Sequence, residues 1–416
     1  KPIYTFPRVF GKLVMMAVEI MVALCNQTDA DMWACIPHLA NDQYVLNFVS
    51  YIHDNLDPDR TLYLEWSNET WNFMSEFTQT AYCFDQAELR WPGEGGDAWM
   101  QFAGMKAAHA MELATSVYAD KPEKLVRVAG MHTGWTGLEY GFLHAPLYIA
   151  EDPDVNREPI ESFDAYAVTG YFAGSLIPET FADEVQAVLD DSIADAQTAA
   201  TGLGLTGPAH DAYVAAHQYD AAIPVLYDHF MGVTPLFSAP DESLATLFNT
   251  TWPYFRALAD TDGKRLVMYE GGLGMIYNFI QDNAALRALL DAFTVSPQMG
   301  LIHEAVLDEW ATVGDGPFMQ YVEMSKPDSY WGTFGARRWE GDDSPRALAL
   351  DAVLLRLHRI RRDSRQATEL LDLAALLYAA QPGVQLFPAI AIEHALQLLH
   401  HGADETPRQP RTRQGQ

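Results

Sequence analysis

Short apolar runs alternate with helical stretches along most of this chain, and that alternation constrains the fold more than any other feature. The predicted strands span residues 32–38, 61–66, 125–132, 163–172, 265–272 and 330–334. Between them, apolar residues recur at helical spacing over residues 42–56, 100–118, 178–195 and 283–293. Strands that alternate with helices form parallel sheets covered by those helices. The sequence therefore predicts an α/β fold.

Polar residues gather where the predicted strands end, and both TIM barrels and doubly wound sheets place their active sites there. No predicted strand leads into a GxGxxG or P-loop motif, so a nucleotide-binding sheet is disfavoured. We therefore expect a (β/α)8 TIM barrel. Six predicted strands are two short of that fold, and only residues 2–9 could supply the two that should precede Pro37. The opening of the barrel is then either degenerate or encoded upstream of this chain.

The composition suits a globular protein with a sizeable core, since 49% of the 416 residues are hydrophobic and 20% are charged. We expect the TIM-barrel domain to occupy residues 1–350. From residue 355 onward the chain has eight Arg against six acidic residues, whereas the preceding part is strongly acidic. Residues 351–405 predict a helical appendage. Residues 406–416, rich in Arg, Gln and Pro, predict a disordered tail.

The chain carries 56 acidic and 26 basic residues, for a formal net charge of -30. Nucleic acids and anionic membranes are bound through Lys and Arg that displace counterions, so neither is an expected partner. Polyanionic substrates are disfavoured for the same reason. The sequence leaves the oligomeric state open.

The longest apolar run, residues 13–25, is too short to span a bilayer and predicts a buried helix. It lacks the basic leader and cleavage site of a signal peptide, so this run is not one. We expect a secreted or periplasmic protein whose signal is not part of this chain. The three cysteines, Cys25, Cys35 and Cys83, follow no disulfide or zinc pattern and predict buried free thiols. No spacing calls for a metal, and no cofactor is expected.

The segment after the second predicted strand carries the first catalytic candidate, Glu69. A general acid must be protonated at its working pH, and an apolar neighbourhood such as Trp66 and Trp71 would raise its pKa. Asn68 is placed to hydrogen-bond a sugar hydroxyl. The alternative is a helix N-terminus, with Ser67 or Asn68 as the cap and Glu69 favoured by the helix dipole.

Glu65 shares a strand face with Glu69, because side chains alternate with a period of two. It should lie one layer deeper in the barrel. There we expect it to pair with a buried Arg or His in a supporting role.

Glu270 is the second catalytic candidate, at the end of the fifth predicted strand. A nucleophile must stay ionised, and the hydroxyl of Tyr269 or Tyr171 could donate the hydrogen bond that keeps it so. Gly271 and Gly272 are expected to leave open space for a bulky substrate. The alternative is a strand-end carboxylate that pairs with Arg.

Aromatic rings stack on the apolar faces of pyranose sugars, and several rings stand near the predicted strand ends. Trp71, Trp135 and Tyr140 are candidate sugar platforms, while His38 and His132 could bind sugar hydroxyls. For each Trp the alternative is core packing, and for each His a structural role.

Asn68-Glu69 after one strand and Glu270 after a later strand resemble the retaining glycoside hydrolases of clan A, which have a (β/α)8 barrel. The run from Tyr63 to Asn72 is similar to poorly characterised, cellulase-like bacterial members. The resemblance covers roughly residues 38–339. It implies that Glu69 is the acid/base at the end of the fourth barrel strand and Glu270 the nucleophile at the end of the seventh.

The same resemblance implies roles for two aromatic residues. Tyr171 would take the place of the aromatic residue or His near the end of the clan's sixth strand, and Trp331 that of the Trp beneath the cleaved sugar. The chain departs from the clan at the opening strands, which usually carry an Arg. We therefore expect a retaining hydrolase of β-glycosidic bonds in a polysaccharide or oligosaccharide. The alternatives are a non-catalytic carbohydrate-binding barrel and a polysaccharide lyase or transglycosylase on the same fold.

Overall fold

The computed structural model describes residues 9–172, 181–236, 244–275, 280, 282–327 and 333–353, with the backbone alone for residues 9–16. The predicted helical appendage and tail, apart from residues 351–353, lie outside these ranges. So does the short segment 2–9, considered above for the two missing strands, except for Val9, which begins a helix.

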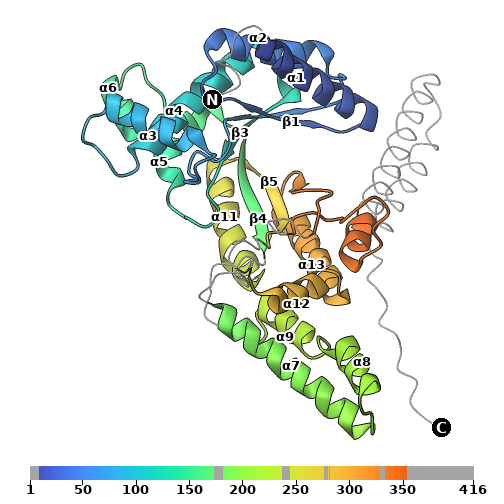
Figure 1. Ribbon diagram of the computed structural model, residues 1–416. Helices are drawn as coiled ribbons and strands as arrows, with labels where there is room; N and C mark the ends of the chain where they lie inside the picture. The colour runs from blue at the N-terminus through green and yellow to red at the C-terminus, as the bar shows by residue number, and fades with distance from the viewer. Residues whose placement is uncertain are drawn as a thin grey trace, which may run out of the picture.

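Six parallel strands form one sheet in the described part of the chain (Figure 1). They are β1 (Met32–Ile36), β2 (Leu62–Trp66), β3 (Leu125–Gly130), β4 (Ala165–Phe172), β5 (Arg265–Leu273) and β6 (Phe318–Gln320). Their order in space is their order in sequence, and every neighbouring pair is parallel. The predicted α/β fold with a parallel sheet is confirmed.

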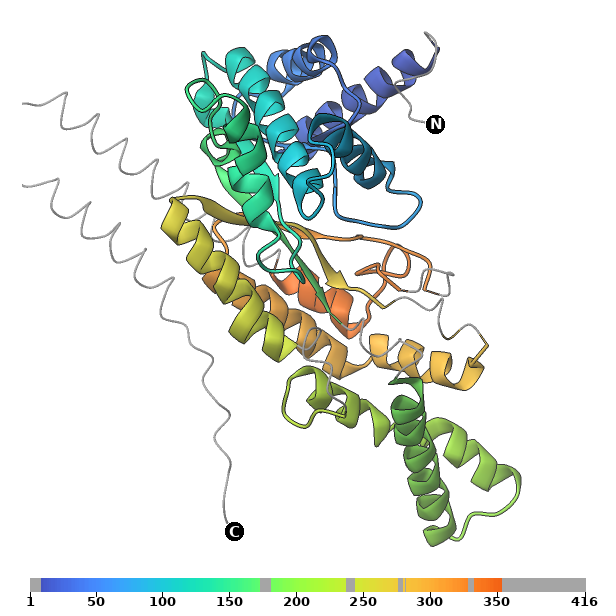
Figure 2. The same ribbon diagram turned by 90° about the vertical axis from the view of Figure 1, so that its left-hand side faces the viewer.

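Helices connect the strands and cover the sheet. The α-helices are α1 (Val9–Thr28), α2 (Asp42–Asn55), α3 (Thr78–Arg90), α4 (Ala98–Val117), α5 (Glu139–His144), α6 (Pro146–Glu151), α7 (Ala182–Gly202), α8 (Pro208–His217), α9 (Ala222–Phe230), α10 (Leu244–Thr246), α11 (Trp252–Asp262), α12 (Ala284–Thr294) and α13 (Pro297–Val313). Helices α1 to α6 gather at one end of the molecule, and α7, α8 and α9 project from the other (Figures 1 and 2).

Helix α2 illustrates why these elements form. Val45, Phe48, Val49 and Ile52 recur at helical spacing and are all buried. The side chain of Asn41 caps the helix by accepting a hydrogen bond from the amide of Tyr44 at 2.9 Å. The predicted helices at 42–56, 100–118 and 283–293 match α2, α4 and α12 within a few residues.

The predicted helix over residues 13–25 is present as α1, but the expectation that it is buried is wrong. Val18 and Val22 are buried, whereas Ile20 is 64% exposed and Leu24 56% exposed. The helix packs on α2 and β1 along one side only. Its outer face therefore remains in solvent. None of the described helices is long and apolar enough to cross a membrane.

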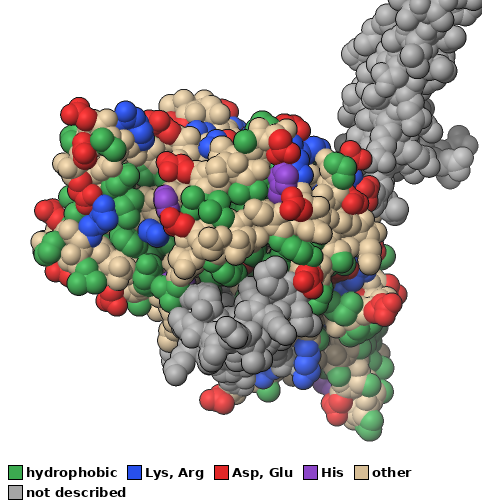
Figure 3. Space-filling view, turned by 90° about the horizontal axis from the view of Figure 1, so that it is seen from above, with side chains coloured by type: hydrophobic (Ala, Val, Ile, Leu, Met, Phe, Trp, Pro, Cys, Tyr) green, Lys and Arg blue, Asp and Glu red, His purple; other side chains and the backbone are tan. Residues whose placement is uncertain are grey.

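All three cysteines are free thiols, as predicted, but their burial differs from the prediction. Cys83 is buried, Cys25 is half-buried and Cys35 is exposed. Figure 3 shows Asp and Glu side chains spread over one face of the molecule with hydrophobic side chains between them.

Five of the six predicted strands are confirmed, and most of the sixth, residues 330–334, lies outside the described residues. The last strand within the described ranges is β6, which the sequence pattern did not predict. In the predicted range only Thr333 and Phe334 are described, and Thr333 forms an isolated antiparallel bridge with Met275. Strand β6 is three residues long and only partly buried, so it has no apolar run that a sequence pattern could detect.

The sheet curls like part of a barrel. Arg265 at the start of β5 donates a hydrogen bond to the hydroxyl of Tyr63 on β2 at 3.1 Å, although two strands separate them in the sheet. The described residues form part of such a barrel and not all eight strands of the expected (β/α)8 fold, because their sheet has six strands and β1 and β6 each have one neighbour.

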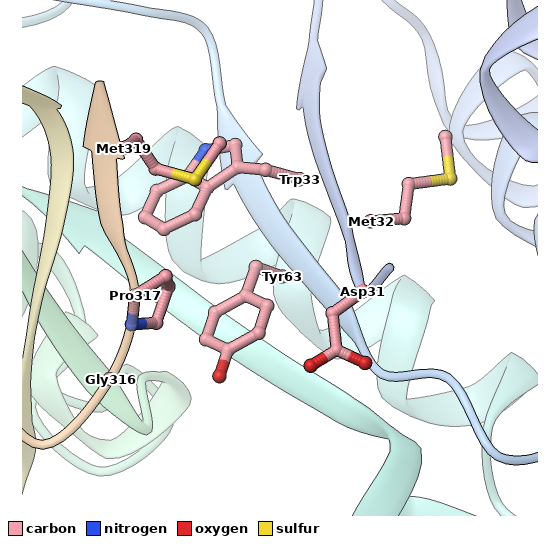
Figure 4. A pocket seen from close by; sticks show the side chains of 7 residues that line it. All are labelled: Asp31, Met32, Trp33, Tyr63, Gly316, Pro317 and Met319. Carbon is pink, nitrogen blue, oxygen red and sulfur yellow. The ribbon is translucent and has the colours of Figure 1, made fainter. Parts of the chain in front are cut away.

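A cavity of about 320 Å3 lies between the two open edges of the sheet. Trp33 on β1 and Met319 on β6 point into this space, beside Tyr63 (Figure 4). In a closed barrel further strands would fill this interval. The curl nonetheless brings the ends of β2 and β5 together, and the candidate site lies there.

Candidate active site

The loop that follows β2 is irregular and strained. Ser67 and Glu69 have φ values of 65° and 45°, in the left-handed region that side chains rarely adopt. The next helix, α3, begins only at Thr78, so the alternative of a helix cap at Ser67 or Asn68 is wrong. Thr80 fixes the loop by donating to the carbonyl of Asn72 at 2.6 Å. Strain of this kind persists where the surrounding structure holds a functional group in place.

Glu69 is half-buried, and both of its carboxylate oxygens accept hydrogen bonds. The hydroxyl of Tyr269 donates to Oε1 at 2.9 Å, and the side-chain amide of Asn72 donates to Oε2 at 2.7 Å. Tyr269 comes from β5, three strands away in the order of the sheet. The curl of the sheet therefore orients the Glu69 carboxylate.

Glu270 is the next residue of β5, where the register with β4 shifts so that Val168 is opposite Met268 and Thr169 is opposite Glu270. The hydroxyl of Tyr171 on β4 donates to its Oε2 at 2.8 Å. Burial raises the pKa of Glu270 to about 7, the hydrogen bond from Tyr171 opposes that rise, and the charge of Glu69 adds to it. Tyr269, which donates to Glu69, directly precedes Glu270, so the fold brings the two glutamates near each other.

Each carboxylate thus has its own tyrosine. The sequence suggested that Tyr269 or Tyr171 would donate to Glu270. In the structure Tyr171 does so, whereas Tyr269 donates to Glu69. No Arg is bonded to Glu270 in the described residues, so the alternative of a strand-end ion pair finds no support there.

A cavity of about 340 Å3 opens beside Glu69. Four of the predicted site residues line it: Glu69, Trp71, His132 and Tyr171. Glu270 is joined to the cavity through Tyr171. The remaining lining residues are Asn72, Phe73, Thr133, Gly134, Thr169 and Tyr269.

The other predicted sugar-binding residues lie away from this cavity or outside the described ranges. Asn68 is half-buried and does not line it. His38 is buried with its ring centroid 5.2 Å from that of Tyr82, which supports the structural alternative. Trp135 is 49% exposed and borders the cavity only through its contact with the ring of His132. Trp331 lies outside the described residues.

His132 and Trp71 form an aromatic wall of the cavity. Their ring centroids are 5.9 Å apart, and Trp71 is almost fully buried. Burial lowers the pKa of His132, so its imidazole is neutral at neutral pH. A neutral imidazole offers one donor and one acceptor, which suits a hydroxyl partner.

Glu65 is buried below the cavity, as the strand pattern predicted, but its expected Arg or His partner is absent from the described contacts. It accepts hydrogen bonds from Trp33 Nε1 at 3.2 Å and from Cys35 Sγ at 3.6 Å. Burial raises its pKa to about 8, and the charges of Glu270 and Glu69 add to the rise against the donated hydrogen bonds. Glu65 is therefore largely protonated at neutral pH.

The two glycines after Glu270 do not leave open space, contrary to the sequence interpretation. A Cβ on Gly271 would lie 2.5 Å from the sulfur of Met268, and one on Gly272 would lie 2.3 Å from Gln320 Nε2. Gly272 also has a φ of 118°. Close packing and backbone conformation, not room for substrate, explain these glycines.

Sequence reasoning missed several residues that the fold brings to the site. Thr169 donates from its hydroxyl to the hydroxyl of Thr133 at 2.8 Å on the cavity wall. Thr169 lies two residues before Tyr171 on β4, so strand periodicity could have placed it on the same face. Tyr321 directly follows β6, and its ring lies 6.2 Å from that of Tyr171. It was missed because the sequence pattern did not predict β6.

Within the described residues, no group of three His, Cys, Asp or Glu side chains is arranged to hold a metal ion. The cavity lining itself offers the Glu69 carboxylate, tyrosine hydroxyls and aromatic rings. Comparisons with protein-family models, with curated proteins and with solved structures found no match.

Proposed function

We propose that this chain is a retaining glycoside hydrolase that cleaves β-glycosidic bonds in a polysaccharide or oligosaccharide. The observation that carries the proposal is the pair of neighbouring carboxylates, Glu69 in the loop after β2 and Glu270 in the second half of β5. Each accepts a tyrosine hydroxyl, and an aromatic cavity lies beside them. Two carboxylates flanking the scissile bond are the equipment that this reaction requires.

The reaction has two displacements. Glu270 attacks the anomeric carbon and forms a glycosyl ester, while Glu69 gives its proton to the leaving oxygen as the glycosidic C–O bond breaks. Glu69, now ionised, takes a proton from water, and the water oxygen attacks the same carbon and releases Glu270 as a carboxylate. Two inversions leave the configuration of the sugar unchanged.

The hydrogen bonds hold both glutamates in place, while the division of roles follows the two strand-end motifs, since donated bonds favour the ionised form of either carboxylate. Tyr171 stabilises the ionised form of Glu270, which the first displacement needs. Tyr269 and Asn72 hold Glu69 from two sides, so its carboxyl faces the cavity in a fixed orientation. Trp71 gives the cavity an aromatic wall for the sugar ring, and the imidazole of His132 is a hydrogen-bond partner for a sugar hydroxyl.

A non-catalytic carbohydrate-binding barrel is the second candidate. Burial raises the pKa of Glu270 to about 7, so below that pH most molecules carry a protonated Glu270. A protonated carboxyl cannot attack the anomeric carbon. A chain of this kind would bind sugar in the cavity without turning it over.

A glycan panel tests the proposal with the wild type and the Glu69→Gln and Glu270→Gln variants. Glu123→Gln, an exposed glutamate in the turn before β3, is the matched control. We expect both site variants to lose activity while the control retains it, and product anomers read by NMR to show retention. A 2-fluoro glycoside should leave its sugar bound to the Glu270 peptide in a mass spectrum. Turnover by Glu270→Gln at the wild-type rate would refute the proposal, and glycan binding without turnover would select the second candidate.

A further inference from the structure

A second cavity, of about 270 Å3, lies beside α3 and the start of α4. Three aromatic residues, Phe84, Trp91 and Trp99, contribute to its lining, together with the carboxylate side chains of Asp85 and Glu88. Gly95 and Gly96 border it, and no atom lies within 4 Å of where their Cβ atoms would be. The cavity is therefore open on the side of these glycines.

Phe73 connects this cavity to the candidate active site. It lines the cavity that contains Glu69, and its ring centroid lies 6.1 Å from that of Phe84 and 5.9 Å from that of Trp99. Its side chain is 66% exposed. An exposed ring between two cavities makes a continuous aromatic surface from one to the other.

Phe84 is held flat within that surface. Its ring stacks on Trp99 with centroids 4.7 Å apart and planes inclined by 17°. Trp99 is 3% exposed, whereas Phe84 is 40% exposed. One face of Phe84 is thus packed against a buried ring, and part of the side chain is free to meet a ligand.

The chemistry of this surface suits an uncharged sugar chain. Aromatic rings offer apolar faces to pyranose rings, and exposed carboxylates such as Asp85 and Glu88 accept hydrogen bonds from hydroxyl groups. The net charge of -30 and these same carboxylates repel a polyanionic chain. Acidic side chains are likewise spread over the face shown in Figure 3.

We infer that Phe73 and Phe84 form an aromatic track that guides an uncharged polysaccharide from the candidate active site into the second cavity. The inference rests on the proposed function for the cleavage step, and it names the substrate class as a long neutral glycan. Short glycosides reach only the first cavity. The track adds binding energy for chains long enough to cover Phe73 and reach Phe84.

Two measurements test the track. The first is the affinity of the Glu270→Gln protein for hydroxyethyl cellulose, galactomannan and arabinoxylan, with polygalacturonate as the anionic comparison. The second is the ratio of kcat/KM on the best polymer to kcat/KM on a short aryl glycoside. We expect Phe84→Ala to weaken polymer binding and lower the ratio about tenfold, or about 1.4 kcal/mol. Phe84→Trp should restore both, and Phe73→Ala should weaken polymer binding.

Leu89→Ala is the matched control, because Leu89 lies on α3, is 75% exposed and lines neither cavity. It should leave the ratio and the affinity unchanged. If Phe84→Ala leaves both polymer affinity and the kcat/KM ratio at wild-type values, the aromatic track is refuted but the proposed hydrolase activity is not. If polymer binding depends on Phe84 but no glycan is cleaved, the proposed hydrolase activity is refuted and the aromatic track is supported. Tighter binding of polygalacturonate than of the neutral polymers would refute the substrate class.

Discussion

Removing the hydrogen bond from Tyr171 to Glu270 is the most direct test of the candidate site. The Tyr171→Phe variant removes the hydroxyl that donates to Glu270 Oε2 at 2.8 Å but keeps the ring, whose centroid lies 6.2 Å from that of Tyr321 and 6.0 Å from that of Phe334. The hydroxyl favours the ionised form of Glu270. Its loss should therefore raise the pKa of that carboxyl further.

The magnitude follows from the strength of such a bond. A hydrogen bond to a charged group is worth about 1.5–3 kcal/mol, and one pKa unit corresponds to about 1.4 kcal/mol. Removing the donor should thus raise the pKa of Glu270 by about one to two units. It starts from about 7. Because only ionised Glu270 can act as a nucleophile, the rising limb of activity with pH should move to higher pH by the same amount.

Two assays read this shift. The pH profile of kcat/KM on a cleaved glycan reports it through catalysis, and NMR titration of 13C-labelled glutamate reports it without catalysis. Tyr166→Phe is the matched control, since its hydroxyl on the same strand donates to Asp262 at 2.8 Å and does not line the cavity. An unchanged or lowered pKa of Glu270 in Tyr171→Phe would refute the reasoning, because it would mean that the tyrosine does not stabilise the carboxylate.

Three further predictions concern stability. The pKa of Glu65 is about 8 in the folded state against an ordinary value of 4.5, so folding binds a proton more tightly and stability falls as pH rises through this window. The free energy of unfolding should fall by about 1.4 kcal/mol per pH unit because of this group. Glu65→Gln should remove that fall, as measured by urea titrations from pH 5 to 8. Gly130→Ala places a Cβ 2.8 Å from Glu65 Oε1 and 3.1 Å from the Trp71 ring. It should lower the free energy of unfolding by about 1–3 kcal/mol, whereas Gly202→Ala, with open space around it, should not. Ser67→Gly should raise the free energy of unfolding by about 0.5–1 kcal/mol, because glycine adopts a φ of 65° without a steric penalty; an unchanged or lower value would show that the loop is not strained.

Local patterns in the sequence predicted most of the elements. Apolar spacing located α2, α4 and α12, and five buried strands were found because each is a nearly continuous apolar run. The period-two pattern also placed Glu65 below Glu69. Strand β6 escaped detection because three partly buried residues carry no such run. The six predicted segments equal the six strands of the described sheet in number, but no local signal shows whether a sheet closes into a barrel.

The candidate site was predictable in its carboxylates but not in their partners. Glu69 stands out because it follows a buried strand, and Glu270 because it lies near the end of another. The donors Tyr269, Asn72 and Tyr171 were assigned only in part, since a hydroxyl can serve any acceptor that the fold brings near. The Tyr269 hydroxyl donates to Glu69, and not to Glu270 as the sequence suggested, because the sheet curls. No local pattern encodes that curl.

The sequence by itself determined the α/β alternation, the acidic charge and the two glutamates at strand ends, because these depend on residues close together in the chain. The tertiary structure decided which side chains meet. It brought residues of β5 and of the loop after β2 to one cavity, gave each glutamate its own tyrosine, and placed Trp33 and Cys35 against Glu65 instead of the expected Arg or His. Among the described residues it formed a sheet of six strands with open edges. Those outcomes depend on sheet curvature and packing across distant segments, and such long-range terms leave no mark in local periodicity.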